Sequence, residues 1–404
     1  MERKVDVLVV GAGIAGLVCS LKLVREGYKV LIIDQLKRIG GQNQRKIDIT
    51  EGANLDSVFG ELNLPLYGEF DRSFWYSKKE FFELKSKVHD YYILRGPDED
   101  SFDVGVANQC LNLGVDISLN TQLKGFALRG NFIESVTVAK NGFTEFITPK
   151  IVVGSDGHNS ICAKLSGLES SVKEGVELIG YGEMCTNIDA PEGETHILFN
   201  TEYCPGGYFY IGQTKGEGLF SIVVEKKKQI GSIASMCKKG KAEIPVLKKI
   251  MRDYAKKSFF VGSGKTGIMR KRSKGNLLLA GDAARTMDPV FGYGVRQAIL
   301  SGYISANLIN EKLSLSITNL EEYDKILRRQ LLKDEWVGHK VRNIFDKMTN
   351  DDIDFVFRSI NNLHINHDLD IILENPSDHI FPILKELSKN PSFFLKVIKL
   401  SVLT

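Results

Sequence analysis

Apolar and polar positions follow three different patterns along the chain, and the changes between them divide it. Residues 5–10 (VDVLVV) and 30–33 are short, almost wholly apolar runs with a helical segment between them, as is typical of parallel strands buried on both faces. Residues 175–225 alternate apolar and polar positions between turns, which predicts an antiparallel sheet. From about residue 315 onward the spacing is helical.

These patterns predict an α/β protein whose second domain is α+β. We expect a discontinuous, three-layer domain of the Rossmann type, a domain built on the antiparallel sheet, and a helical C-terminal region. The expected bounds are 1–65, 93–170 and 268–312 for the first domain, 66–92 and 171–267 for the second, and 313–404 for the helical region.

Several local elements follow from turn and cap chemistry. A helix is expected over about 101–113, with Asp100 or Ser101 as its N-cap. Asn141 and Gly142 predict a hairpin turn. Residues 242–257 read as an amphipathic helix, and residues 276–281 form a strand that is followed by a helix starting near Gly294.

A glycine motif joins the first two predicted strands. Gly11, Gly13 and Gly16 fit the pattern G-x-G-x-x-G, a strand precedes them, and a helix follows. Asp34 ends the second strand about 20 residues further on, where a carboxylate can accept hydrogen bonds from a ribose. This arrangement predicts a dinucleotide site at the helix N-terminus, but the motif alone does not separate FAD from a nicotinamide cofactor.

Composition narrows the class of protein. The formal net charge is +3, which gives no reason to expect a nucleic-acid partner, and the short lysine clusters at 226–228 and 238–241 are expected to be solvated. The six cysteines are widely spaced, so reduced thiols and a cytoplasmic location are expected rather than disulfides. His364 and His367, the one pair with a ligand-like spacing, are read as surface residues, and no metal site is expected.

Three further segments invite other interpretations. GSGKT at 262–266 resembles part of a P-loop, but Phe259 stands where that motif needs its first glycine, so we reject it. No apolar run reaches the length of a membrane span, while the C-terminal FFLKVIKLSVLT either lies on a membrane surface or packs as a helix on the protein. The aromatic residues of 66–92 form a sheet core, the wall of an apolar pocket, or both.

Three separated motifs together carry a family resemblance. They are the glycine motif with Asp34, the strand end Gly154–Gly157 (GSDG), and Ala280–Ala284 (AGDAA). Their order and spacing resemble the FAD-binding fold of the aromatic hydroxylases and their relatives. Within that group, PGGYFYIGQ at 205–213 and the segment after Ala280 are similar to the geranylgeranyl (digeranylgeranylglycerophospholipid) reductase family over nearly the whole chain.

The resemblance implies FAD as the cofactor and assigns roles to residues. Ala15 and Asp34 would contact the adenosine side, and Arg95 and Leu123 would flank the cofactor. The middle motif, with Asp156, would brace the cofactor region. The late motif would hold the ribityl chain and the edge of the isoalloxazine through Gly281, Asp282, Gly294 and Val295.

The resemblance also implies a substrate and a reaction. Such enzymes reduce isolated C=C bonds of a geranylgeranyl-type isoprenoid or prenyl lipid by hydride transfer from reduced flavin, with NAD(P)H or a ferredoxin as reductant. An apolar slot would be lined by Tyr208, Phe209, Tyr210 and Phe291, and either tyrosine is a weak candidate for proton donor or a core residue. Arg285 and Arg296 would meet a headgroup phosphate or remain exposed charges.

The chain departs from that family in two places. Tyr210 and Gly212 stand where the family has Trp and Phe, and the loop at 40–46 lacks the cysteine that archaeal members carry near the flavin. Two alternatives therefore stay open: a flavin monooxygenase-type hydroxylase, and a flavin-binding protein without turnover. A halogenase is disfavoured because the W-x-W-x-I-P motif is absent. Peripheral contact with the cell membrane is expected, and the sequence leaves the oligomeric state open.

Overall fold

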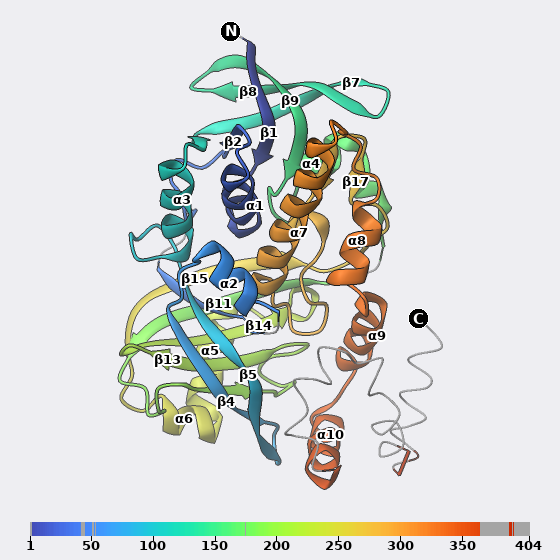
Figure 1. Ribbon diagram of the computed structural model, residues 1–404. Helices are drawn as coiled ribbons and strands as arrows, with labels where there is room; N and C mark the ends of the chain where they lie inside the picture. The colour runs from blue at the N-terminus through green and yellow to red at the C-terminus, as the bar shows by residue number, and fades with distance from the viewer. Residues whose placement is uncertain are drawn as a thin grey trace.

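Two mixed layers built on two large sheets make up the computed structural model, which describes residues 2–41, 45–50, 52, 54–173, 175–363, 388–389 and 391 (Figure 1). The first sheet has the order β17-β18-β9-β1-β2-β6, and β7 and β8 extend it from β9. Its strands are β1 (Glu2–Val10), β2 (Val30–Ile33), β6 (Asp116–Ser118), β7 (Thr121–Arg129), β8 (Phe132–Lys140), β9 (Phe143–Gly154), β17 (Ser273–Lys274) and β18 (Leu277–Leu279).

The central strands of this sheet are buried on both faces, as the apolar runs predict. Val7 and Val9 of β1 belong to the core cluster under α1 (Ile14–Arg25), α3 (Phe102–Asn112) and α7 (Val295–Ser314). Leu8 and Val10 point to the opposite cluster, which β7, β8 and α4 (Ile161–Ser166) cover. β1 pairs in parallel with both β2 and β9, so the doubly wound core is confirmed.

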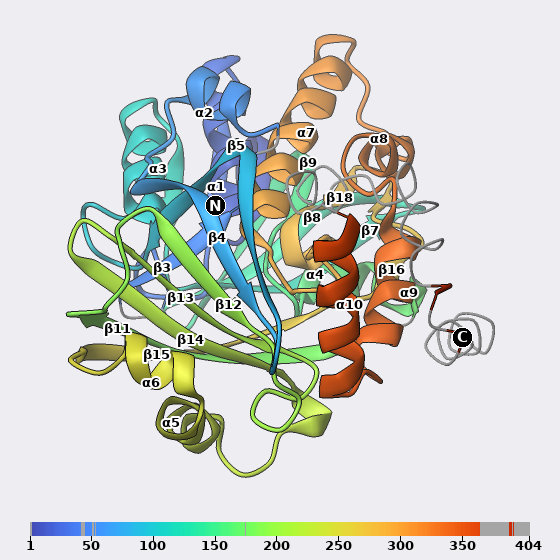
Figure 2. The same ribbon diagram turned by 90° about the horizontal axis from the view of Figure 1, so that it is seen from below.

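The second sheet has the order β15-β11-β14-β13-β12-β4-β5-β3. Figure 2 shows it from below, with α5 (Ile233–Glu243) and α6 (Pro245–Ile250) beneath it. Its strands are β3 (Lys46–Thr50), β4 (Gly68–Tyr76), β5 (Phe81–Arg95), β11 (Glu177–Thr186), β12 (Glu194–Leu198), β13 (Tyr208–Thr214), β14 (Glu217–Glu225) and β15 (Ala255–Lys265), and the small pair β10 (Val172–Lys173) and β16 (Ile268–Met269) joins the two layers.

The remaining elements are helical. α8 (Tyr323–Gln330), α9 (Glu335–Phe345) and α10 (Asn350–Leu363) descend along one side from the first layer to the second (Figure 1). The others are α2 (Asp56–Leu62) and the short η1 (Leu168–Ser171), η2 (Lys226–Lys228) and η3 (Gly281–Ala284). The rest of the predicted helical region, with His364, His367 and the apolar C-terminal segment, lies outside the described residues. No described helix is both long enough and apolar enough to cross a bilayer.

Several local predictions can now be compared with the structure. Ser101 caps α3, because its side chain accepts a hydrogen bond from the Val104 amide. Asn141 and Gly142 have φ values of 50° and 84° in the β8–β9 turn, as the predicted hairpin requires. All six cysteines are buried and free.

The helix predicted over 242–257 is wrong. α5 ends at Glu243, α6 covers only Pro245–Ile250, and Ala255 already begins β15. The reason is tertiary, because β15 pairs along its length with β11 and those pairs outweigh the helical spacing. All of the GSGKT segment except Thr266 is part of β15, and the next element is the strand β16 rather than a helix.

The second sheet also starts earlier in the chain than the expected domain bounds. β3 pairs with the last residues of β5, from Lys46 opposite Arg95 to Thr50 opposite Tyr91. Residues 46–50 and 93–95 therefore belong to the second sheet, although the sequence pattern grouped them with the first domain. A five-residue strand carries no local mark of its partner, so only the long-range pairing decides where it lies.

Candidate functional site

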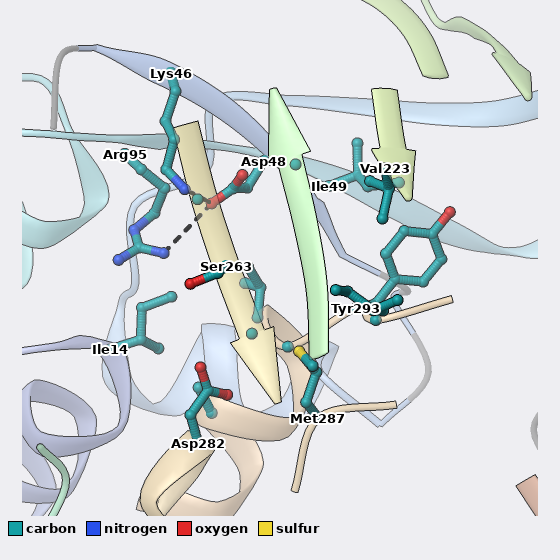
Figure 3. A pocket seen from close by; sticks show the side chains of 18 of the residues that line it. Ile14, Lys46, Asp48, Ile49, Arg95, Val223, Ser263, Asp282, Met287 and Tyr293 are labelled. Atoms are coloured by element: carbon teal, nitrogen blue, oxygen red, sulfur yellow. Dashed lines mark hydrogen bonds and ion pairs between the residues drawn. The ribbon is translucent and has the colours of Figure 1, made fainter. Parts of the chain in front are cut away.

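A cavity of about 410 Å³ lies between the two sheets, where the N-termini of α1 and α7 meet. Figure 3 shows Asp282 and Ile14 at one end, Arg95 and Lys46 on one side, and Tyr293, Val223 and Ile49 on the other. β15 and β11 run side by side past it. Ten of the predicted residues line it: Gly13, Ala15, Arg95, Gly281, Asp282, Gly294, Val295, Tyr208, Tyr210 and Phe291.

The first helix presents uncapped backbone donors to this cavity. α1 has Gly13 as its N-cap, no side chain caps it, and its first turn contains no acidic residue. Gly11 has φ = 107°, and a side chain there would come within 2.4 Å of the Ser155 carbonyl oxygen. A Cβ on Gly13, by contrast, would meet nothing within 4 Å. The open space beside an uncapped helix N-terminus fits a phosphate.

Asp34 and Gly16 support this turn rather than lining the cavity. The Asp34 carboxylate accepts hydrogen bonds from the amides of Ala12 and Leu36, each at 2.7 Å. A Cβ on Gly16 would come within 2.1 Å of the Gly11 carbonyl oxygen, so this glycine permits the close packing of helix and turn. Asp34 thus holds the turn in place through these hydrogen bonds. It does so at the position where the ribose of a dinucleotide would lie.

The second helix repeats the arrangement. α7 begins after Gly294, again with no side-chain cap and no acidic residue in its first turn. The Asp282 carboxylate lies next to it, since a Cβ on Gly294 would be 3.4 Å from Asp282 Oδ1. Within the described residues no hydrogen bond or ion pair engages the Asp282 carboxylate, and Figure 3 shows it directed into the cavity. Such a carboxylate is suited to accept hydrogen bonds from the hydroxyl groups of a ligand.

The charges around Asp282 compensate for its burial in part. Burial raises the pKa of Asp282, while the nearby basic side chains of His158, Arg285, Arg95 and Lys46 act to lower it. Two carboxylates and two cations therefore line the cavity: Asp48 is paired with Lys46 and Arg95, and Asp282 is the acceptor left without a partner. This balance favours a ligand that combines hydroxyl donors with anionic groups, as the ribityl diphosphate of FAD does.

Arg95 is held in place by carboxylates from two elements. Its Nε and Nη2 donate to Asp103 at 2.7 and 2.8 Å, and its Nη1 lies 3.4 Å from Asp48. Lys46 pairs with Asp48 at 2.9 Å. Burial disfavours the charge, but Asp103 raises the pKa of Arg95 above its ordinary value. Arg95 therefore reaches from the end of β5 to Asp103 in the first turn of α3.

Three predicted residues lie elsewhere. Phe209 is fully buried on the other face of β13, stacked on Phe220, because neighbouring residues of a strand point to opposite faces. We therefore correct its placement in the substrate slot. Asp156 accepts hydrogen bonds from Ser160 Oγ and the amides of Ile161 and Cys162, and so caps α4. Leu123 is part of β7, and its side chain packs in the core cluster that contains Leu8 and Val10.

One wall of the cavity was not predicted from the sequence. Gly262, Ser263 and Gly264 of β15 line it, together with Met287. A Cβ on Gly264 would come within 2.7 Å of Met287 Sδ, so the glycine allows the strand to close over the cavity. The signal for this wall in the sequence is the Gly-Ser-Gly segment itself, which also resembles part of a P-loop.

A second cavity of about 390 Å³ adjoins the first. Both are lined by Ile49, Tyr210, Met287, Phe291 and Tyr293, which separate them. The inner end of the second cavity is apolar and aromatic, and its outer end reaches the turn between α8 and α9. Residues of the inner end include Phe70, Trp75, Leu84 and Ile197.

Two tyrosines of β13 face these cavities. The Tyr208 hydroxyl donates to the carbonyl oxygen of Phe291 at 2.9 Å. The Tyr210 hydroxyl lies with that of Tyr92 above Gly212, where a Cβ would come within 2.8 and 2.7 Å of the two oxygens. Burial raises the pKa of Tyr210. The glycine at 212 thus makes room for a pair of buried hydroxyl groups, one of them on Tyr210, whose side chain lines both cavities.

Taken together, the fold and the site define a two-layer flavoprotein of the Rossmann type, with its cofactor cavity between two helix N-termini. The profile of the FAD-binding domain family matches residues 4–314, and the chain belongs to that family. FAD is therefore its cofactor, and the uncapped α1 and α7, the space beside Gly13 and the unengaged Asp282 fit that group. No described cluster of His, Cys, Asp and Glu has the arrangement of a metal site.

The named relatives to which the chain is similar are reductases. The chain is 27% identical over 381 residues to a digeranylgeranylglycerophospholipid reductase of Methanosarcina mazei, with 89% of each chain covered. It is 27% identical over 365 residues to an enzyme of that name from Methanocaldococcus jannaschii, covering 86% of this chain and 88% of the other.

Solved structures show the same fold. A geranylgeranyl bacteriochlorophyll reductase-like protein of Thermoplasma acidophilum superposes with a TM-score of 0.78 at 18% identity, covering 99% of this chain and 100% of the other. A flavin-dependent brominase superposes with a TM-score of 0.72 at 16% identity, covering 92% and 93%. At these identities the likeness concerns the fold alone.

Proposed function

We propose that this protein is an FAD-dependent oxidoreductase that reduces isolated C=C bonds of a geranylgeranyl-type prenyl lipid. The observation that carries the proposal is the second cavity, whose inner end is rich in aromatic side chains and which shares five lining residues with the cofactor cavity. A long isoprenoid chain in that cavity would lie directly beside the flavin. The names of the relatives, which are reductases of such lipids, support the same substrate class.

The chain's own residues supply binding, orientation and exclusion of water. FAD, when bound in its reduced form, supplies the hydride for the double bond. An isolated double bond is not polarised, so the reaction depends on holding the double bond close to the flavin and excluding water from it. The aromatic side chains of Trp75, Phe70 and Phe291 provide a surface on which an isoprenoid chain packs.

The reaction also needs a proton for the second carbon of the double bond. Tyr208 is a poor source because its hydroxyl already donates to the Phe291 carbonyl. Tyr210 is the better of the two candidates, since it lines both cavities and its hydroxyl lies beside that of Tyr92.

The proposal is tested by a product assay without oxygen. The purified holoprotein is reduced chemically with dithionite, so that the natural electron donor does not matter, and is mixed with a digeranylgeranyl glycerophospholipid. We expect products that gain two hydrogen atoms for each double bond reduced. A lipid recovered unchanged, or one altered only in the presence of oxygen, contradicts the proposal and favours the hydroxylase alternative.

We also propose that the protein is cytoplasmic and acts at the membrane surface, where its lipid substrate resides. The outer end of the second cavity supports this, because Trp336 and Val341 of α9 are 62% and 39% exposed beside it. Flotation with anionic phospholipid vesicles is expected to carry the holoprotein upward, and Trp336→Ser is expected to weaken this. A protein that stays at the bottom of the gradient refutes membrane association.

A further inference from the structure

Residues 285–294 form a loop that borders both cavities, and we call it the cavity loop. It runs from the end of η3 to Gly294 at the start of α7. Met287, Phe291 and Tyr293 of this loop line both cavities, and Figure 3 shows Met287 and Tyr293 beside the first one. These residues are all described in the structure, and none of them lies in a regular helix or strand. The position of the loop therefore depends on the elements that contact it.

One face of α9 contacts the cavity loop. Gly338 lies against it, since a Cβ there would come within 2.6 Å of Pro289 Cγ. Arg342, one turn further along the helix, donates from Nη1 to the carbonyl oxygen of Val290 at 2.8 Å. Residues four positions apart lie on the same face of a helix. α9 therefore holds two consecutive residues of the loop.

The other terminal nitrogen of the same guanidinium reaches a different segment. Arg342 Nη2 donates to the carbonyl oxygen of Gly206 at 2.6 Å, in the turn that leads into β13. Two residues later, the Tyr208 hydroxyl donates to the carbonyl oxygen of Phe291, which follows Val290 in the loop. The rings of Tyr208 and Phe291 also meet edge to face, with centroids 6.1 Å apart. Two bridges, one from Arg342 and one from Tyr208, thus join the loop to the start of β13.

The charge of Arg342 is buried, since the residue is only 2% exposed. Asp346, one turn later, lies 2.6 Å from Nη2, and Lys228 lies 3.5 Å from the same carboxylate. Burying an arginine costs desolvation energy, and an apolar side chain of similar size would also pack α9 against the loop. The guanidinium adds a planar fork, whose two terminal nitrogens set the loop and the turn at fixed positions relative to each other.

We propose that Arg342 is a positioning residue for reduction of the lipid, because it holds the wall formed by Tyr208 and Phe291 between the two cavities. Arg342 lines neither of the two cavities described above, so it acts through the loop and not by touching a ligand. The proposal rests on the proposed function for the nature of that ligand. Without Arg342 the lipid still binds, but its double bond is held less well, so kcat falls more than KM rises.

Three variants test this role. Arg342→Met removes both bridges of the guanidinium but keeps a long side chain. Arg342→Lys keeps the charge without the planar fork and is expected to retain one bridge. Gly338→Ala presses on the same loop from the neighbouring contact. The matched control is Lys241→Met on α5, which breaks a buried ion pair with Glu183, 2.6 Å long, at a residue that lines neither cavity.

The first measurement is amide hydrogen exchange of each FAD-loaded protein. The amides of Val290 and Phe291 donate to Asp288 Oδ2 at 2.8 and 3.0 Å, so they report on the cavity loop directly. We expect Arg342→Met and Gly338→Ala to speed up their exchange at least about tenfold relative to the core strands β1 and β9. Lys241→Met is expected to leave this ratio unchanged, although it unfolds at a lower urea concentration.

The second measurement is steady-state reduction of a digeranylgeranyl glycerophospholipid without oxygen, with dithionite as the reductant. We expect Arg342→Met and Gly338→Ala to lower kcat about tenfold to hundredfold while KM changes less than about threefold. Arg342→Lys is expected to lie between Arg342→Met and wild type, and Lys241→Met to retain the wild-type kcat. If Arg342→Met does not fold, Arg342→Lys and Gly338→Ala provide the same comparison.

The outcomes separate this inference from the proposed function. If the Arg342 and Gly338 variants match Lys241→Met in loop exchange and in kcat, the positioning role is refuted, and lipid reduction by the wild type leaves the proposed function standing. If the same variants speed up loop exchange but the wild type reduces no lipid, Arg342 does hold the wall and the proposed function fails.

Discussion

Gly302 of α7 offers a sharp test of how the cofactor site is built. A Cβ at this position would come within 2.4 Å of the carbonyl oxygen of Ala15 in α1. The two helices whose N-termini face the cofactor cavity therefore touch through this glycine. Gly302→Ala forces them apart, because the obstructing atom belongs to the backbone and cannot rotate away.

The size of the effect follows from this contact. Ordinary contacts begin at about 3.4 Å, so α1 and α7 must separate by about 1 Å. Overpacking of this kind costs about 1–3 kcal/mol, which outweighs the gain of about 1 kcal/mol from placing Ala in a helix. The shift also displaces one uncapped helix N-terminus relative to the other, so we expect FAD to bind at least about tenfold more weakly.

Gly60 of α2 provides the matched control, since a Cβ there would meet nothing within 4 Å. Urea unfolding and FAD fluorescence titration are measured for both variants. Gly60→Ala is expected to stabilise the protein by about 0.5–1 kcal/mol and to leave FAD affinity unchanged. A tenfold loss of affinity in Gly302→Ala removes about 1.4 kcal/mol of the stabilisation by saturating FAD. If the two variants behave alike, the close contact of α1 and α7 does not position the site.

Three further predictions follow from single side chains. Asp282→Ala is expected to weaken FAD binding about tenfold to hundredfold in the same titration, because the carboxylate is free to accept ligand hydroxyl groups, and full retention of FAD contradicts this role. Tyr210→Phe is expected to lower the rate of lipid reduction by about a hundredfold, and Tyr208→Phe by less than about tenfold; equal effects refute the choice of proton donor. Burial lowers the pKa of His196 to about 4 in the folded protein, below the value of about 6.5 expected in the unfolded chain. The folded protein is therefore most stable above about pH 6.5, where His196 is neutral in both states, and loses stability as the pH falls toward 4. We expect the free energy of unfolding to decrease by about 3 kcal/mol across that pH range, and His196→Phe to abolish the decrease.

Local patterns predicted the parts of the site that short segments determine. The spacing of Gly11, Gly13 and Gly16 specifies a strand, a turn and a helix in one continuous stretch, and the structure has that arrangement. The segment containing Asp282 and Gly294 was found for the same reason. Each motif positions its own helix N-terminus, so no knowledge of distant contacts was needed.

Contacts between distant segments decided what the sequence pattern missed. Alternation along β13 shows that Tyr208 and Phe209 point to opposite faces, but not which face meets the cofactor cavity. The helical spacing around Val246 and Ile250 was real, yet the pairing of β15 with β11 ended that helix early. The wall formed by Ser263 arises only when the second sheet folds over the first.

The most direct test of the account is a single turnover without oxygen. The FAD-loaded protein is reduced, mixed with a digeranylgeranyl glycerophospholipid in slight excess, and followed by flavin absorbance and by product mass. We predict that each flavin reoxidised corresponds to one double bond reduced, with a gain of two hydrogen atoms. Flavin that stays reduced until oxygen is admitted, with a product that has gained an oxygen atom, would contradict the proposal that this protein is a prenyl reductase.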